Sequence, residues 1–136
     1  MARIIASAEA LNNADSKRVH VTAGDIAHLS GDAIEYGSNT MGPSPGDYLC
    51  MSLASCQAIT LRQFAKRKKW KIDSINVKVS LVKWDQAETA RNTFFVELIL
   101  GGDLNASQRK QLMEIARSCP VHRLLGKPSD VVMVIT

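Results

Sequence analysis

Two cysteines are the residues of this chain most able to carry out chemistry, as a pair of thiols. Cys56 lies in the segment Leu-Ala-Ser-Cys-Gln, and Cys119 lies in Ser-Cys-Pro-Val-His. About sixty residues separate them, which excludes a CxxC redox loop and a zinc knuckle. Such a pair can exchange thiol for disulfide only if the fold brings the two Cα atoms within about 7 Å of each other.

Each cysteine also has a plainer interpretation. A lone cysteine on an apolar helix face is more often an inert core residue than a nucleophile. Cys50 falls under this interpretation, because the step of six residues to Cys56 turns a helix by about 240° and the two thiols face apart. For Cys56 and Cys119 the pattern alone leaves both interpretations open. In a reducing compartment three cysteines do not predict a structural disulfide framework.

The element that must position Cys56 is a long helix. Ser44 can cap its start and Asp47 can complete a capping box, which predicts a helix over Pro45–Lys68. Between residues 48 and 61 the apolar side chains spread around most of the helical wheel, which indicates burial on nearly all sides. A small domain cannot easily cover such a helix. We therefore expect a homodimer, with this helix at or near the shared core.

Cys119 is predicted to end a second helix. Asn105 can cap that helix with Gln108 at its third position, and apolar residues then follow at helical spacing as far as Cys119. Pro120 stops the helix or starts a further turn. Cys119 would then lie where backbone N–H groups and the helix dipole favour a thiolate, and this argument makes it the more acidic thiol.

The remaining segments predict strands, so the fold class is α+β. The expected order is N-terminal antiparallel strands, a long central helix, a β-hairpin, a second helix and a C-terminal strand. The strands are predicted at 3–8, 18–22, 26–29, 72–84, 93–100 and 131–135, with loops at 37–45 and 85–90 and a short turn at 121–125.

Composition indicates one globular domain over residues 1–136. The chain is 46% hydrophobic and 22% charged, which is ordinary for a folded domain. No apolar run approaches the roughly 18 residues that span a bilayer, and no signal-peptide core is present, so the expected location is the cytoplasm. The net charge of +4 does not indicate a nucleic-acid partner. The basic run 66–71 is more simply a solvated helix end.

Five segments carry a family resemblance by their order and separation: Gly42–Leu49, Leu53–Cys56, Thr60–Arg62, Ala65–Trp70 and Ala116–His122. Together they resemble the OsmC/Ohr family of osmotically induced and organic hydroperoxide resistance proteins. The likeness covers the chain from about Gly31 to the C-terminus.

The resemblance implies an OsmC-like fold, intertwined as a homodimer with the active site at the subunit interface. It implies a thiol peroxidase that uses no metal or flavin and reduces organic hydroperoxides, with hydrogen peroxide as a second substrate. In family terms Cys56 is the peroxidatic thiol, which becomes a sulfenic acid, and Cys119 is the resolving thiol, which condenses with it. A small thiol or dithiol then reduces the disulfide. The helix dipole would instead make Cys119 the nucleophile, and we adopt the roles that the family resemblance implies.

Two features depart from the family pattern. The peroxidases of the family carry a glutamate directly after the proline that opens the long helix, where this chain has Gly46. Asp47 follows it, half a turn out of phase with Cys56, which favours a helix cap. The family's activating arginine has no clear counterpart, and the candidates are Arg18, Arg62, Arg117 and Arg123. Without such an arginine we expect slow turnover and membership of the OsmC-like branch.

Three further interpretations stay open. His122 can tune the second thiol, although a packing or surface role is more usual for a lone histidine. A non-catalytic redox-sensing or structural OsmC-like dimer would keep the fold and the thiols but show no turnover. Nucleic-acid binding through residues 66–71, with Trp70 among them, would show as salt-dependent retention on DNA or RNA.

Overall fold

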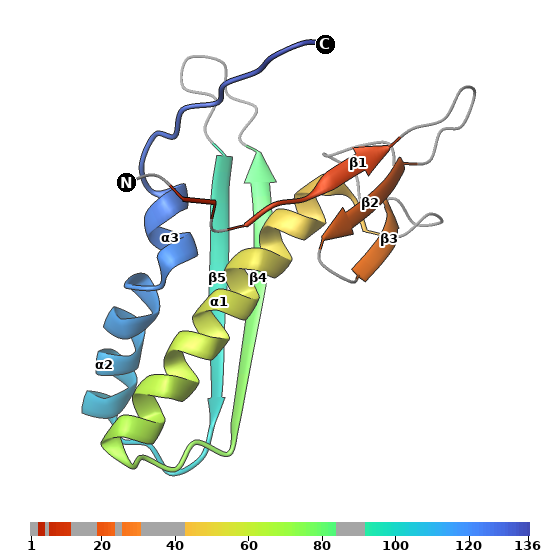
Figure 1. Ribbon diagram of the computed structural model, residues 1–136. Helices are drawn as coiled ribbons and strands as arrows, with labels where there is room; N and C mark the ends of the chain where they lie inside the picture. The colour runs from red at the N-terminus through yellow and green to blue at the C-terminus, as the bar shows by residue number, and fades with distance from the viewer. Residues whose placement is uncertain (1–2, 5, 12–18, 24–25, 31–42, 84–91) are drawn as a thin grey trace. The chain divides into compact units, whose positions relative to one another are not determined.

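The computed structural model describes residues 3–4, 6–11, 19–23, 26–30, 43–83 and 92–136. They belong to two compact units, Met1–Leu49 and Cys50–Thr136. The elements of both units are labelled in Figure 1. The described chain is a mixed α+β protein with antiparallel strands and three helices, which confirms the predicted fold class.

The first unit contains a small antiparallel sheet. Its strands β1 (Glu9–Leu11), β2 (Val19–Ala23) and β3 (Ile26–Ser30) pair in that order. The second and third strands lie where the alternation of apolar residues predicts them. The strand predicted at 3–8 is wrong, because the strand begins at Glu9, where pairing with β2 starts.

The long helix α1 (Pro45–Lys68) has the predicted bounds and begins with a reciprocal cap. The Asp47 backbone N–H donates to Ser44 Oγ at 3.1 Å, and the Ser44 N–H donates to Asp47 Oδ2 at 2.8 Å. Both interactions satisfy helix-terminal N–H groups that have no partner within a helix. Asp47 is therefore a helix cap, as its phase relative to Cys56 predicts.

The end of α1 is a Schellman motif built without glycine. Lys69 adopts a left-handed φ of 58°. The Trp70 N–H donates to the Ala65 carbonyl at 2.9 Å, and the Lys69 N–H donates to that of Lys66 at 3.2 Å. The Trp70 ring meets Phe64 edge-on, with 5.5 Å between the ring centroids, which is the apolar contact that accompanies this motif. The basic run therefore has a structural role at the helix end.

The second unit packs helices on one face of a hairpin. The strands β4 (Ser74–Lys83) and β5 (Asn92–Gly101) pair over their whole length, and their half-buried side chains alternate with exposed ones. The helix α2 (Ala106–Arg117) has the predicted capping box, and α3 (Pro120–Leu125) follows it. The loop predicted at 85–90 and most of the loop predicted at 37–45 lie outside the described residues.

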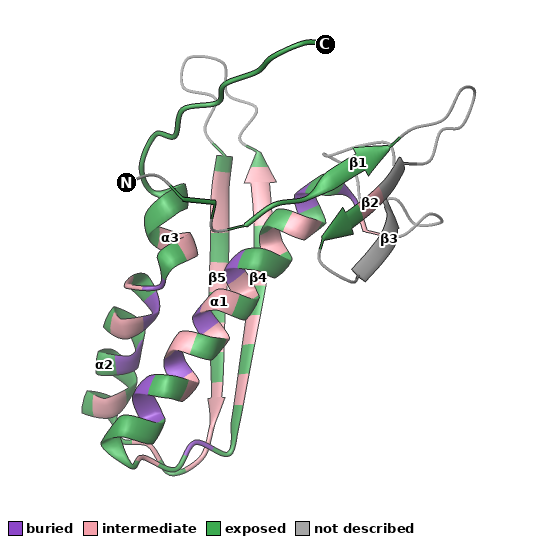
Figure 2. Ribbon diagram, viewed as in Figure 1, coloured by how far each residue is buried: buried purple, intermediate pink, exposed green. Residues whose placement is uncertain are grey.

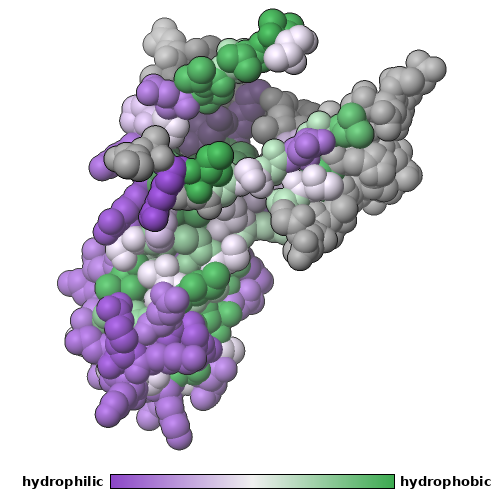
Figure 3. All heavy atoms as spheres, in the orientation of Figure 1, coloured by the Kyte–Doolittle hydropathy of each residue, from purple (hydrophilic) through white to green (hydrophobic). Residues whose placement is uncertain are grey.

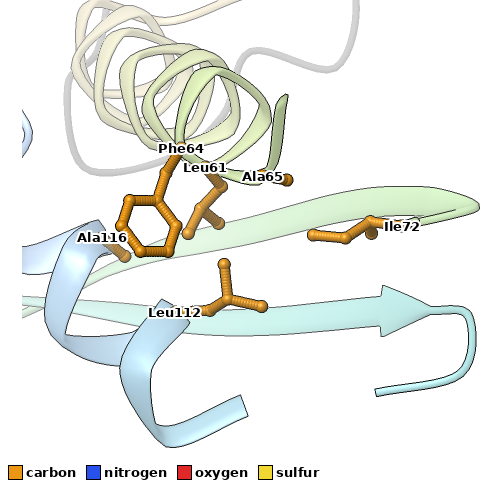
Figure 4. Close-up of a cluster of buried hydrophobic side chains, with 6 residues drawn as sticks. All are labelled: Leu61, Phe64, Ala65, Ile72, Leu112 and Ala116. Carbon is orange, nitrogen blue, oxygen red and sulfur yellow. The ribbon is translucent and has the colours of Figure 1, made fainter. Parts of the chain in front are cut away.

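One apolar cluster joins α1, α2 and the hairpin. Figure 2 shows the buried positions along α1 and α2, and Figure 4 shows the side chains that meet between these helices. Ile75, Leu98 and Leu100 of the hairpin pack against them from the sheet. The cluster consists of Leu61, Phe64, Ala65, Ile72, Leu112 and Ala116.

The structure corrects one predicted element at the C-terminus. Residues 131–136 form no strand, and the side chains from Val131 to Ile135 are 84–98% exposed. A strand forms only where a neighbouring strand takes up its backbone hydrogen bonds, and no described strand pairs with this segment. Figure 3 shows its apolar side chains exposed on the surface at the C-terminal end.

Candidate active site

Cys119 lies at the junction of α2 and α3 and is fully buried, with 0% of its surface exposed. Its extended backbone makes it the N-cap of α3, and its Sγ accepts a hydrogen bond from the His122 backbone N–H at 3.3 Å. Pro120 takes the first helical position, where a missing N–H is no loss. Pro120 therefore starts a further helix, which is one of the two outcomes that the sequence predicts.

Cys56 lies on α1, is half-buried, and interacts with Cys119. Its backbone carbonyl accepts a hydrogen bond from Thr60 Oγ1 at 2.8 Å, which holds the helix turn that follows it. All three cysteines of the chain are thiols in this structure. The fold of the second unit thus brings together two cysteines that lie about sixty residues apart in the sequence.

The pKa of the Cys119 thiol is raised from its ordinary value of 9.0. Burial is the largest cause, because it disfavours the charged thiolate. The N–H groups of His122 and Val121 lower this pKa, whereas a hydrogen bond to Cys56 and the negative charge of Cys56 raise it further. Burial thus outweighs the hydrogen bonds of the cap in setting the pKa of Cys119.

A buried amide joins α1 to the segment that carries Cys119. Gln57 is 2% exposed, and its Nε2 lies 3.4 Å from the Ala116 carbonyl oxygen and 3.3 Å from His122 Nδ1. Its Oε1 is buried without a hydrogen-bond partner among the described residues. His122 is thus held through its backbone to Cys119 and through its ring to the neighbour of Cys56.

An apolar pocket of about 180 Å³ opens beside these residues. Among the described residues that line it, His122 is the one with a titratable side chain. Leu53 reaches it from α1, one turn before Cys56, and Phe94 and Val96 reach it from β5. Leu125 and Gly126 also line it. The arrangement can hold a small organic molecule with one polar end.

The candidate activating arginines in the described chain have other positions. Arg62 donates from Nη1 to the Ile72 carbonyl at 2.8 Å. Arg117 forms an exposed ion pair with Glu114 at 2.8 Å. Arg123 is exposed on α3, and Arg18 lies outside the described residues. The contacts of Arg62 and Arg117 thus give neither of them a role at the thiols.

Gln57 is the residue at this site that the sequence reasoning missed. It stands in line with Leu53 and Leu61, four residues from each, on the buried face of α1. A lone amide within an apolar stripe is a signal that could have been used, since a buried polar group needs partners. Its partners lie 59 and 65 residues away and could not be named in advance.

The described residues form neither a cluster of metal ligands nor a helix that could cross a membrane. Histidine, cysteine, aspartate and glutamate side chains nowhere gather there in threes that could hold a metal ion. Among the described helices, none has the length and apolar character needed to cross a membrane.

Comparisons with known proteins agree with this architecture. Residues 37–134 match the family model described as OsmC-like protein. An organic hydroperoxide resistance protein OsmC from Legionella pneumophila superposes with a TM-score of 0.68 at 18% identity, covering 92% of this chain and 91% of the other. OhrB, the organic hydroperoxide resistance protein of Bacillus subtilis, superposes with a TM-score of 0.61 at 22% identity, covering 89% of this chain and 90% of the other.

An OsmC-like protein from Mycoplasma pneumoniae gives a TM-score of 0.68 at 17% identity, covering 89% of this chain and 86% of the other. No curated protein matches by sequence. At these identities the solved structures establish the fold, and the family model covers most of the chain. The chain therefore belongs to the OsmC-like protein family.

Proposed function

We propose that this protein is a thiol-dependent peroxidase that reduces organic hydroperoxides, with hydrogen peroxide as a second substrate. Cys56 is the peroxidatic thiol and Cys119 is the resolving thiol. The observation that carries the proposal is that the second unit brings the side chains of Cys56 and Cys119 close enough to interact. Two proteins of similar structure are named organic hydroperoxide resistance proteins, which supports hydroperoxides as the substrate class.

The chemistry follows from this pair. The Cys56 thiolate attacks the terminal oxygen of R–O–O–H, the O–O bond breaks, and Cys56 becomes a sulfenic acid while RO⁻ leaves and takes a proton from water. Cys119 then displaces water from the sulfenic sulfur and forms the disulfide. Oxidation of Cys56 removes its negative charge, so one cause of the raised pKa of Cys119 disappears at the step that needs a thiolate there.

The pocket lined by Leu53 and His122, which lie three residues from Cys56 and Cys119, supports an organic substrate. Its apolar side chains come from α1, β5 and α3, so an alkyl or aryl group can leave water there. Reduction of the disulfide completes the cycle and needs an external thiol or dithiol. We propose the cytoplasm as the setting, because its thiol pool is reduced.

A peroxide consumption assay with dithiothreitol or dihydrolipoamide as reductant tests the proposal. We expect Cys56→Ser to abolish consumption of cumene hydroperoxide and Cys119→Ser to stop after one turnover with a sulfenic acid on Cys56. Cys50→Ser is the matched control and should keep the activity. Loss of activity with Cys119→Ser before the first turnover would reverse the two roles. Reversible oxidation without turnover in the wild type would favour the redox-sensing alternative.

We further propose that two copies of the chain form a homodimer with α1 at or near the shared core. The proposal is supported by apolar side chains that a single copy leaves in water: Met51 and Ile59 on α1 are 46% and 57% exposed, and residues 131–135 are almost fully exposed. Exposed apolar surface of this kind is typical of interaction sites.

Light scattering during size-exclusion chromatography tests the dimer. We expect the wild type to elute with the mass of two chains, and Ile59→Asp to shift it toward one chain. The same change at Gln111, exposed on α2, is the control and should leave the mass unchanged. A wild type with the mass of one chain would overturn this proposal.

A further inference from the structure

Two polar side chains at or next to the pocket have no part in the proposed thiol chemistry: His122 lines the pocket, and Gln57 contacts His122. Gln57 is buried beside Cys56, and the half-buried His122 lines the pocket. The Gln57 amide nitrogen lies within hydrogen-bond distance of His122 Nδ1, at 3.3 Å. Their contact joins the two segments that carry the thiols.

The contacts of Gln57 determine which nitrogen of His122 carries hydrogen. The carbonyl oxygen of Ala116 can only accept a hydrogen bond, so the atom of the Gln57 amide that faces it is Nε2 and not Oε1. The same Nε2 faces His122 Nδ1, which must then act as acceptor. In a neutral imidazole one nitrogen accepts and the other donates, so Nε2 of His122 carries the hydrogen.

The cost of this arrangement indicates that it serves more than packing. Gln57 Oε1 is buried with no partner among the described residues, which is unfavourable for a polar atom. An apolar side chain of similar size, such as methionine, would fill the same space on α1 without that cost. The amide nitrogen is what such a side chain could not supply to His122.

We propose that His122 is a catalytic residue that donates a hydrogen bond from Nε2 to the leaving oxygen of the hydroperoxide, and that Gln57 is the positioning residue that sets its tautomer. The proposal rests on the proposed peroxidase function. His122 lines the pocket that would hold the organic group, and its backbone N–H contacts the sulfur of Cys119, which in turn interacts with Cys56.

The step balances without a further reactant. Cys56 thiolate takes the terminal OH of R–O–O–H, the O–O bond breaks, and the electron pair of that bond stays on RO⁻. His122 stabilises RO⁻ by a hydrogen bond and keeps its own hydrogen, while water supplies the proton that makes ROH. Such a bond strengthens as negative charge develops, so it acts on the transition state more than on bound substrate.

Leaving-group dependence tests the role of His122. tert-Butyl hydroperoxide releases a strongly basic alkoxide, whereas peracetic acid releases the stable acetate ion. In single-turnover oxidation of Cys56 we expect His122→Leu to lose about 10- to 100-fold in rate with tert-butyl hydroperoxide and less than about threefold with peracetic acid. Leu125→Val is the matched pocket control and should show no such difference between the two peroxides. The backbone N–H at residue 122 that caps Cys119 remains in His122→Leu.

The role of Gln57 has its own measurement. We expect Gln57→Met to oxidise Cys56 more slowly with tert-butyl hydroperoxide but not with peracetic acid. Its urea unfolding midpoint should equal or exceed that of the wild type. Two-bond ¹⁵N–¹H spectra should report His122 as the Nε2–H tautomer, with its signals assigned by their loss in His122→Leu.

The possible failures are distinguishable. A wild type that reacts with neither peroxide overturns the proposed function and the role of His122 within it. If the wild type is active but His122→Leu lowers the oxidation rate equally with both peroxides, or does not lower it, only the role of His122 is overturned. An Nδ1–H tautomer in the wild type, or full activity in Gln57→Met, overturns the positioning role of Gln57.

Discussion

Alkylation of Cys119 should be strongly suppressed in the folded protein. Iodoacetamide reacts with the thiolate, and at about pH 7.5 a thiol with the ordinary pKa of 9.0 is ~3% ionised. The pKa of Cys119 is raised above that value, chiefly by burial, so its thiolate fraction is smaller still. Each pKa unit removes a further factor of about ten.

Burial adds a second factor. Because Cys119 is 0% exposed, the reagent reaches the sulfur only after the junction of α2 and α3 opens. A local opening free energy of about 3 kcal/mol lowers the rate by roughly 100-fold. The product of both factors predicts that native Cys119 is alkylated at least about 100-fold more slowly than the same residue in urea.

Peptide mapping after timed labelling measures this ratio. Cys56, half-buried on α1, provides the comparison within the same sample, and we expect a smaller change for it between native and unfolded protein. Labelling of Cys119 at similar rates in native protein and in urea would refute both its burial and its suppressed ionisation.

Three further predictions concern stability. Lys69→Gly should raise the free energy of unfolding by about 1 kcal/mol, because glycine adopts the left-handed conformation of Lys69 without the side-chain penalty; Lys68→Gly, one residue earlier in α1, should lower it by a similar amount in thermal unfolding. Leu112→Ala should cost about 3 kcal/mol in urea unfolding because Leu112 is 0% exposed in the core, whereas the exposed neighbour change Met113→Ala should cost less than about 1 kcal/mol. Stability should also fall as pH rises above about 9, because unfolded Cys119 loses its proton before native Cys119 does; a Cys119→Ala variant with an unchanged alkaline slope would contradict this.

Local signals made the helices predictable. The Ser44 and Asp47 pair, like Asn105 and Gln108, caps a helix through contacts three residues apart, so the sequence itself contains both partners. The alternation in β4 and β5 was equally readable, because each strand buries one face against the helices.

Contacts between distant segments set the limit of prediction. Residues 131–135 alternate like a strand, yet no described strand pairs with them. Gln57 was missed because its partners come from α2 and α3. The approach of Cys56 to Cys119 could not be derived from their spacing, and only the family resemblance suggested it. The reduced acidity of Cys119 depends on burial, which the cap motif does not reveal.

Mass spectrometry after one equivalent of cumene hydroperoxide tests the central claim most directly. The reduced protein is treated without added thiol, blocked with an alkylating reagent and digested under non-reducing conditions. The account predicts a new disulfide that joins Cys56 to Cys119, with Cys50 still a thiol. Unchanged Cys56 and Cys119 thiols, or a disulfide that includes Cys50, would contradict it.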